Sequence, residues 1–313
     1  MSRSAELQAL RESVRALLTR HSDPVTAVDT PLGYDDKLWS LLCGIGVAAL
    51  AIPERFGGLG AGLAEVCVVQ EELGRTLTPS PHLGSAVLCG QALLATGNDE
   101  ACERLLPGIA DGSRTAALVG DQYVLDGDSA DILLVVDESG LYEVDPADVT
   151  RTRLPTMDQT IRLAEVILGD APRRRLGDQP VRHDFAVVAL AAEQVGAAAR
   201  ALELTVEYSK QRHQFGRPIG GFQALKHRMA DMFVRVEAAR SALHAALSSP
   251  NETNAAVARI VCSETFQHVA AEMIQLHGGI AITWEHDAHR FFKHAHSTAH
   301  LLGTPESYLA KLF

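Results

Sequence analysis

The sequence predicts a mainly α-helical protein with a small β domain in the middle of the chain. Two observations lead to this fold class. Helical periodicity dominates both ends of the chain, whereas short β-branched and aromatic runs gather between about residues 116 and 168. We therefore expect an N-terminal helical domain over residues 1–115, a truncated β domain with a linker over 116–180, and a C-terminal antiparallel four-helix bundle over 181–313.

The composition limits the classes of function. The 313 residues are enough for two or three domains, and the net charge of −11 gives no bulk attraction for nucleic acid or an acidic membrane. No uninterrupted apolar run reaches the roughly 18 residues that span a bilayer, and the charged N-terminus does not resemble a signal peptide. Five cysteines, an odd number without a CxxC, indicate reduced thiols and a cytoplasmic location.

Glycine and proline divide the first domain into short helices. The breaks lie at "SDPVTAVDTPLGYDD", "PERFGGLGAG" and "TPSPHLGS", which predicts five or six helices before about Gly112. The segment "AEVCVVQEELGRTL" places its apolar residues on one helix face. Glu71 and Glu72 are therefore expected on the opposite, polar face.

The β domain is short. The runs "QYVLDGD" and "DILLVVDESGLYEVD" are bounded by Asp-Gly and Ser-Gly turns, and "RTRLP" and "TIRLAEVIL" are typical of further strands. About fifty residues of this kind are too few for an independent sandwich. The following "GDAPRRRLGDQPVRHD" is interpreted as a surface linker with three solvated arginines.

The last domain has the strongest periodicity. One apolar stripe with steps of three and four predicts a helix of about seven turns; its members are Leu225, Met229, Met232, Val236, Ala239, Leu243 and Leu247. Pro250 and Asn251 are expected to start the next helix, and Gly278 with Gly279 to end it.

The bend within "YSKQRHQFGRPIGGFQALKHRMADM" carries more chemistry than a turn between two helices needs. Arg212 offers a planar fork for phosphate, and Phe215 offers an apolar ring face. Gln223 in this stretch and Gln275 in "IQLHGGIAITWEHDAHRFFKHAH" offer hydrogen-bond donors and acceptors. The glycine pair after Gln275 lets a ligand approach the backbone closely. Together these groups could hold a pyrophosphate and an adenine.

The same two stretches resemble motifs of the acyl-CoA dehydrogenase family. The first resembles that family's "Y…R.QFG.PI..FQ…..LADM", and "QLHGGIAITWEHDAHRFFKHA" resembles its "Q..GG.G.T.E….R..RDA". The N-terminal "IPERFGGLGAGLAEVCVVQEELGRTL" is similar as well, so the resemblance covers nearly the whole chain. It implies an acyl-CoA dehydrogenase-like fold.

The resemblance also implies a cofactor. In this family the two motifs reach across a subunit interface and hold the adenosine and pyrophosphate half of a neighbour's FAD. The matching cofactor-binding positions here are Arg212, Phe215, Gln223, Gln275, Gly278 and Gly279. The competing interpretation is structural: the arginine and glutamines would cap the turn, and the glycines would end a helix.

The positions of the family's catalytic base are not occupied by an acid. The base is a glutamate in "Tyr-Glu-Gly-Thr", and the corresponding stretch is Leu301-Leu302-Gly303-Thr304, with Leu302 at the glutamate position. Some members carry the base near the start of the first bundle helix, where this chain has Ala186. Neither residue can accept a proton, so the sequence assigns no catalytic residue.

The β domain departs from the family too, because the "TEP..GSD" loop and the "W.TNA" strand that surround the flavin ring are missing. The resemblance thus points to the non-catalytic (beta) subunit of actinobacterial heterotetrameric steroid-CoA dehydrogenases. It implies a two-plus-two heterotetramer with a full-length catalytic partner, which shares its FAD and binds most of the acyl-CoA.

Two alternatives stay open. Glu193 lies on a helix face of small apolar residues and could replace the base in a self-sufficient homotetramer, although a packed structural glutamate is the simpler interpretation. The chain could also be a non-enzymatic scaffold. A metal site is not predicted, because no HExxH or Cys/His grouping occurs and the spacings do not hold one helical face; the histidines concerned are His286, His289, His294, His296 and His300.

Overall fold

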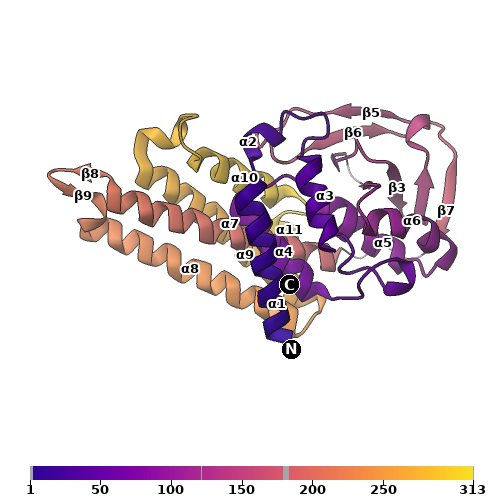
Figure 1. The fold of residues 1–313 in the computed structure, drawn as a ribbon, viewed down its shortest axis with the longest axis horizontal. Helices are drawn as coiled ribbons and strands as arrows, with labels where there is room; N and C mark the ends of the chain where they lie inside the picture. The colour runs from indigo at the N-terminus through magenta and orange to yellow at the C-terminus, as the bar shows by residue number, and fades with distance from the viewer. Residues whose placement is uncertain (1–2, 121, 179–182, 313) are drawn as a thin grey trace. The chain divides into compact units, whose positions relative to one another are not determined.

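The computed structural model describes residues 3–120, 122–178 and 183–312. It forms two compact units, Met1–Val69 with Thr78–Ala189 and Gln70–Leu77 with Leu190–Phe313. Helices come first, short strands follow, and long helices complete the chain (Figure 1). The prediction of a mainly α-helical protein with a small β region is confirmed.

The helices of the first unit are short because capping residues and breakers follow each other closely. Asp23, Asp35 and Asn98 accept hydrogen bonds from the first backbone N–H groups of three of them. All eight residues of the π-helix are buried. The helical elements are α1 (Arg3–His21), α2 (Pro24–Ala27), α3 (Asp36–Gly44), η1 (Glu54–Phe56), the first half of α4 (Leu63–Thr76), the π-helix η2 (His82–Cys89), α5 (Gly90–Ala95) and α6 (Asp99–Ala110).

Two small sheets complete this unit. The four-stranded sheet has the order β1-β3-β4-β7, in which only the β1–β3 pair is parallel. The antiparallel three-stranded sheet has the order β2-β6-β5. The strands are β1 (Ala116–Val119), β2 (Val124–Leu125), β3 (Ile132–Asp137), β4 (Gly140–Val144), β5 (Thr150–Arg153), β6 (Leu163–Ile167) and β7 (Arg173–Gly177), with η3 (Pro146–Asp148) between β4 and β5.

Strand β7 corrects the prediction of a linker. The three consecutive arginines lie in the outer strand of the four-stranded sheet, where Arg173, Arg174 and Arg175 pair with β4. Each arginine also has an acidic partner; the pairs are Arg173–Asp137, Arg174–Glu100 and Arg175–Asp178. Because ion pairs form on both faces of this outer strand, a sequence that is typical of a loop can adopt the strand conformation here. The rest of the predicted linker includes residues 179–182, which lie outside the described residues.

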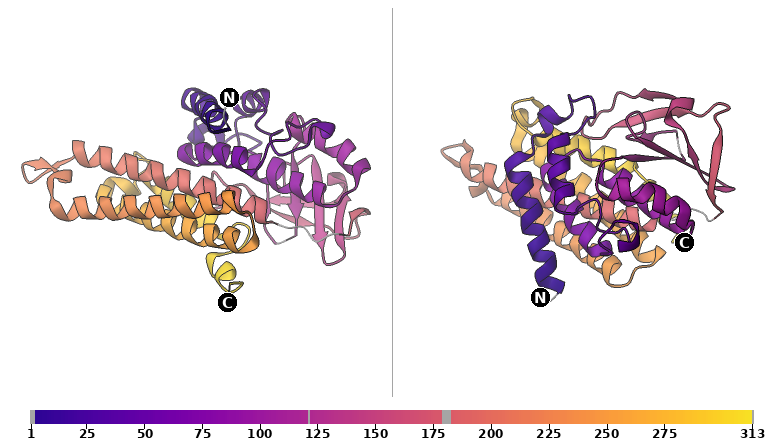
Figure 2. Two further views of the ribbon diagram at one scale, coloured as in Figure 1. Left: turned by 90° about the horizontal axis from the view of Figure 1, so that it is seen from below. Right: turned by 45° about the vertical axis from the view of Figure 1, so that its right-hand side comes forward.

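The second unit is built from long helices. Figures 1 and 2 show α7 and α8 running side by side and joined at their tip by the β8–β9 hairpin. Most of the predicted α8 stripe is buried, because Met232, Val236, Ala239 and Leu243 face the core. The elements are α7 (Asp184–Gln211), β8 (His213–Gln214), β9 (Arg217–Pro218), η4 (Ile219–Gly221), α8 (Gln223–Ser248), α9 (Glu252–His277), η5 (Gly278–Ile282), α10 (Ala288–His300) and α11 (Pro305–Leu309).

Helix α7 is the apolar centre of this bundle. Among the described helices it is the one that meets the length and composition of a membrane span, yet 83% of that apolar stretch is buried within the protein. Alanines along its length let neighbouring helices approach, as expected for the inner helix of a bundle.

The second half of α4 packs against α7 and α8, which corrects the prediction for Glu71 and Glu72. Both side chains are buried instead of facing solvent, and Glu71 Oε1 lies 2.6 Å from Arg240 Nη1 on α8. The α4–α7 crossing is close, because a Cβ added to Gly74 would lie 2.1 Å from the carbonyl oxygen of Glu193. Both faces of this half-helix are therefore covered.

Candidate functional site

The turn after α7 is exposed and shaped by two residues with positive φ. Phe215 has φ +53° and its side chain is 91% exposed, and Gly216 follows at φ +78°. The backbone N–H of Arg212 donates to Tyr208, and the Arg212 carbonyl accepts from the N–H of Ile219. Gln223 begins α8, and its amide lies 3.2 Å from the His227 ring nitrogen. The turn thus presents its arginine and its ring to solvent.

This turn is also the most cationic part of an acidic chain. Residues 208–230 hold five lysines and arginines and no carboxylate, although the net charge of the protein is −11. Arg228 is paired with Glu272, and Arg217 stacks over the Phe222 ring at 4.0 Å. The Arg212 side chain makes no hydrogen bond or ion pair within the described part of the chain. A guanidinium left free in this way is suited to an external anion.

The end of α9 leaves open space beside its backbone. Gly278 has φ +68°, and its N–H donates to the Ile274 carbonyl to cap the helix. A Cβ built on Gly278 or Gly279 would meet no heavy atom within 4 Å. Gln275, one turn earlier, is exposed. Neither packing nor crowding fills the space next to the glycine pair, so a ligand could approach it.

The structure brings these two segments together. The rings of Tyr208 and His277 stack with centroids 4.2 Å apart and an interplanar angle of 24°. Tyr208 Oη also donates to the His277 carbonyl oxygen at 3.2 Å. Tyr208 lies one helical turn before Arg212, and His277 directly precedes Gly278, so both predicted segments occupy the same end of the bundle. Sequence reasoning missed this contact, although Tyr208 is the tyrosine of the first motif.

The side chains at this end fit the adenosine and pyrophosphate part of FAD. A free guanidinium, an exposed phenyl ring, two exposed amides and an open glycine pair match the phosphate oxygens, flat rings and hydroxyls of such a group. In addition, His277 Nε2 is buried and has no hydrogen-bond partner among the described residues. We therefore find no conflict between these residues and the cofactor that the motifs imply.

The base positions are apolar in the structure as in the sequence. Leu302 follows α10 with φ +56° and is partly buried, and its carbonyl oxygen accepts a hydrogen bond from Tyr308 Oη at 2.6 Å. Ala186 is completely buried in the first turns of α7. A proton acceptor is therefore absent from the side chains at both positions.

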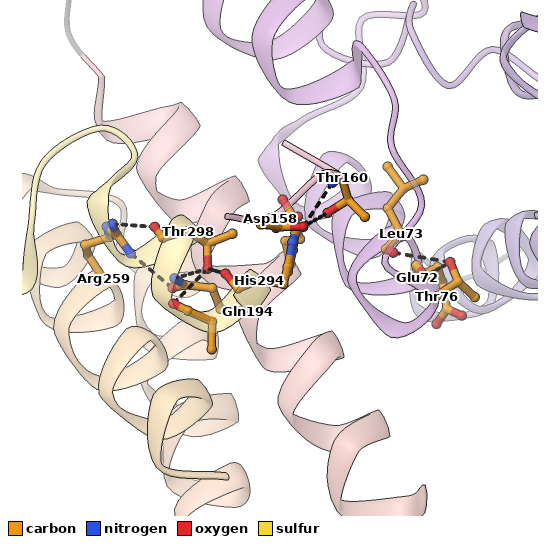
Figure 3. A network of polar contacts seen from close by, with 11 residues as sticks. Glu72, Leu73, Thr76, Asp158, Thr160, Gln194, Arg259, His294 and Thr298 are labelled. Carbon is orange, nitrogen blue, oxygen red and sulfur yellow. Dashed lines mark hydrogen bonds and ion pairs between the residues drawn. The ribbon is translucent and has the colours of Figure 1, made fainter. Parts of the chain in front are cut away.

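A buried arginine holds the backbone around Leu302. Arg259 on α9 is fully buried, and Figure 3 shows it directed toward Thr298 and Gln194. Its Nη1 donates to Gln194 Oε1 at 3.1 Å, and burial lowers the pKa of Arg259 to about 10. Its Nη2 lies 2.8–3.0 Å from four carbonyl oxygens, which share its two protons; they belong to Thr298, Ala299, Leu301 and Gly303. The guanidinium thus provides hydrogen bonds to backbone carbonyl groups at the end of α10 and in the loop beyond it.

Glu193, the candidate substitute base, is engaged inside the bundle. Its Oε1 lies 2.9 Å from His294 Nε2 on α10, and the two side chains are 15% and 5% exposed. The position of His294 corresponds to the aspartate of the family's "RDA", so an acid on α7 and a histidine on α10 form a pair here. This geometry favours the interpretation of Glu193 as a packed structural residue over its interpretation as a catalytic base.

The other histidines of this region are dispersed. His289 packs against the Trp284 ring, and His296 packs against Phe292. Within residues 3–120, 122–178 and 183–312, no group of three His, Cys, Asp or Glu side chains is arranged to hold a metal ion.

Strands β2 and β3 of the first unit are joined by a short connection. Only residues 126–131 separate β2 from β3. Asp126 has φ +56°, and its carbonyl accepts the N–H groups of Ser129 and Ala130, so these residues form a tight turn.

Comparison with known proteins agrees with the motifs. Residues 4–113 match the family model "Acyl-CoA dehydrogenase, N-terminal domain", and residues 184–312 match "Acyl-CoA dehydrogenase, C-terminal domain". The chain is 48% identical to acyl-CoA dehydrogenase IpdE2 of Mycolicibacterium smegmatis, over 99% of this chain and 98% of the relative. It is also 48% identical to IpdE2 of Mycobacterium tuberculosis, over 100% and 98%.

Solved structures show the same fold. The Tcur3481-Tcur3483 steroid ACAD variant matches with a TM-score of 0.88 and 30% identity, over 99% of this chain and 97% of that one. The ChsE4-ChsE5 complex from Mycobacterium tuberculosis matches with a TM-score of 0.86 and 27% identity, over 98% and 95%. With both family models matched and full-length relatives at 48% identity, the chain belongs to the acyl-CoA dehydrogenase family.

Proposed function

We propose that this chain is the non-catalytic subunit of a heteromeric, cytoplasmic, FAD-dependent acyl-CoA dehydrogenase. In this proposal it supplies the adenosine and pyrophosphate half of the FAD site of a full-length catalytic partner. The partner contributes the flavin-ring site, the base and most of the acyl-CoA contacts, and two copies of each chain form the tetramer.

One combination of observations carries the proposal: the cofactor-type segments are intact and adjacent, whereas the base position is a leucine. Arg212 is free, and the glycine pair is open at the same end of the bundle. Leu302 occupies the glutamate position, and Glu193 is paired with His294. A chain that keeps half a cofactor site without its own base is best explained by a partner that completes it.

The substrate class and the partner are inferred from the relatives. Two of the similar structures carry the names of two different chains, Tcur3481-Tcur3483 and the ChsE4-ChsE5 complex, and the first is named a steroid ACAD. We therefore propose a steroid-derived acyl-CoA as substrate and a full-length family member as partner. The short β2–β3 connection supports the assignment of the flavin-ring site to the partner, because it leaves little chain to surround a flavin ring.

The reaction requires a base for the α-proton of the thioester and an acceptor for the β-hydride. FAD, when bound, supplies the hydride acceptor. The residues of this chain act on binding: Arg212 neutralises phosphate charge, Phe215 covers an apolar face, and the Gly278–Gly279 backbone admits the ligand. They orient the cofactor without moving a proton.

Flavin content tests the proposal. We expect the chain purified alone to be poorly soluble or to lack FAD, because without the partner its apolar side chains such as Phe233 and Val234 stay exposed. Co-purification with a co-expressed full-length acyl-CoA dehydrogenase from the same genome should yield a yellow two-plus-two complex with two FAD. A yellow, active homotetramer would instead support Glu193 as base, and a complex in which no FAD contact involves this chain would support the scaffold role.

A further inference from the structure

We infer that Tyr208, His277 and His286 form an aromatic clasp that sets the spacing between the two cofactor-binding segments. These three side chains are therefore positioning residues for the adenosine and pyrophosphate half-site. The inference rests on the proposed function, since it concerns how that half-site is held in shape.

The clasp is a cluster of three rings at the end of the bundle. Tyr208 and His277 stack at 4.2 Å, and His286 lies 4.6 Å from His277 and edge-on to Tyr208 at 6.1 Å. The Tyr208–His277 pair also has a hydrogen bond, from the tyrosine hydroxyl to the histidine carbonyl. Elsewhere the core of this bundle is formed mainly by alanine, aliphatic and phenylalanine side chains. A cluster with polar edges at this end provides directional contacts that an aliphatic core does not.

All three side chains hydrogen-bond to backbone groups. The Tyr208 hydroxyl donates to the His277 carbonyl at the end of α9, while Tyr208 itself lies at the end of α7, one turn before Arg212. His277 Nδ1 lies 2.8 Å from the Met273 carbonyl and thus donates its proton there, and the next residue is Gly278. His286 Nδ1 accepts the N–H of Ala288 at the start of α10. Movement of any ring would therefore be transmitted to α7, α9 or α10.

The Arg228–Glu272 ion pair also joins α8 to α9, but the turn that carries Arg212 has few links of its own. The β8–β9 hairpin consists of two residues in each strand, and the Arg212 side chain makes no hydrogen bond or ion pair in the described chain. Neither glycine at the end of α9 is packed by neighbouring atoms at its Cβ position. Tyr208 is one helical turn from Arg212 and His277 directly precedes Gly278, so the tyrosine–histidine contact links the two segments close to both the guanidinium and the glycine backbone. A shift of about 1 Å in such a pair is enough to misalign a bound ligand.

The test uses the complex with the catalytic partner and compares FAD with FMN, which lacks the adenosine monophosphate half. Affinities are measured by titrating the flavin-free complex and following the quenching of flavin fluorescence. We expect Tyr208→Leu and His277→Leu to weaken FAD binding about three- to tenfold, the range expected for one lost aromatic pair, and to leave FMN affinity unchanged. Tyr208→Phe keeps the stack and loses only the hydrogen bond to the His277 carbonyl, so it should weaken FAD binding less than Tyr208→Leu does.

Phe291→Leu is the matched control. Phe291 is buried in the same bundle on α10, and it is neither one of the proposed cofactor-binding residues nor a member of the clasp. This change should lower the urea midpoint without altering the ratio of FAD to FMN affinity. If the clasp variants reduced FAD and FMN binding equally, or if Phe291→Leu changed the ratio as they do, the cluster would be ordinary core packing. Should His277→Leu fail to assemble, Tyr208→Leu carries the same test because it removes the same stacked pair.

Arg212→Ala separates this inference from the proposed function. If this change leaves the ratio of FAD to FMN affinity unaltered, the chain does not contact the adenosine half and the proposed function is wrong. If Arg212→Ala lowers the ratio while the clasp variants do not, the half-site stands and only the positioning role is wrong.

Discussion

The Glu193 carboxylate lies 2.9 Å from His294 Nε2, and this contact joins α7 to α10 within the bundle. Glu193 also lies where α4 crosses α7 closely, since a Cβ on Gly74 would lie 2.1 Å from its backbone carbonyl oxygen. A glutamate whose carboxylate pairs with a neighbouring helix and whose backbone lies in a helix crossing is part of the helix packing. It is poorly placed to swing toward a substrate.

Glu193→Gln should therefore reduce stability and leave turnover of the complex near wild type. Glutamine can still hydrogen-bond to His294, but the bond loses its charge assistance, so we expect a loss of about 1–2 kcal/mol in the free energy of unfolding. Urea denaturation checks the expected loss of stability, and steady-state desaturation of an acyl-CoA checks the unchanged turnover. A turnover number that fell a hundredfold with unchanged stability would make Glu193 the base after all.

Arg259→Met should destabilise the chain strongly. The change leaves four backbone carbonyls and the Gln194 amide without their donor in a buried site, and each such group costs roughly 1–3 kcal/mol. We expect a loss of about 3 kcal/mol or more, read from the urea midpoint of the complex. Arg104→Met is the control, because its partly exposed pair with Glu143 is expected to contribute about 1 kcal/mol or less.

Arg212→Ala should weaken FAD retention by the complex about tenfold, as expected for a lost charge-assisted hydrogen bond to phosphate. The measurement is the dissociation constant from flavin fluorescence. Arg235→Ala removes an equal charge from an exposed position of α8 outside both segments, so it should have little effect. Equal losses in both variants would mean that only the overall charge matters.

Leu302→Glu should create no new active sites. A carboxylate at this position has no flavin ring to work with in our proposal, and an ionised group placed among apolar neighbours must be hydrated, paired or neutralised. Single-turnover reduction by an acyl-CoA should give two reduced flavins per tetramer in both wild type and variant. Four reduced flavins in the wild type, or a doubling in Leu302→Glu, would show that this chain has a flavin pocket of its own.

Acid should destabilise the first unit through His82. Burial lowers the pKa of His82 from 6.5 to about 4 in the folded protein. Between these values the unfolded chain binds a proton that the folded chain does not, so stability is full above pH 6.5 and falls as the pH drops toward 4. The difference between the two pKa values corresponds to about 3 kcal/mol in the free energy of unfolding. Urea denaturation at pH 7 and pH 4.5 should show this loss, and His82→Gln should reduce it.

Asp126 provides a control of opposite sign. Burial raises the pKa of its carboxyl from 3.8 to about 7, so the folded chain takes up a proton before the unfolded chain as the pH falls. Protonation of this residue therefore adds stability in acid, and Asp126→Asn should make the acid-induced loss steeper. A flatter pH profile in Asp126→Asn would contradict this assignment.

Much of the helical organisation follows from local pattern in the sequence. The three-and-four spacing from Leu225 to Leu243 is sufficient to define α8, because only one face of that helix is buried. Asn251 and Gly278 bound α9 through capping interactions that depend on nearby residues alone. Such features need no knowledge of the rest of the chain.

The errors arise where distant segments decide the outcome. Glu71 looks solvent-facing from its own helix, and only the crossing with α7 and the ion pair with Arg240 show why it is buried. The same reason hid the contact between Tyr208 and His277, which are 69 residues apart. The positions of Arg212 and the glycine pair were predictable from their motifs, but the rings that join them were not.

The arginines of β7 have a consequence for the behaviour of the isolated chain. The outer strand of a sheet offers free backbone groups that can recruit a strand from another molecule and begin aggregation. Three consecutive guanidinium groups, each already engaged with an acid, make such recruitment unfavourable because a docking strand would have to displace or desolvate them. The chain is thereby protected from polymerising through its own sheet, which matters most if it must remain available for a second polypeptide, as we propose.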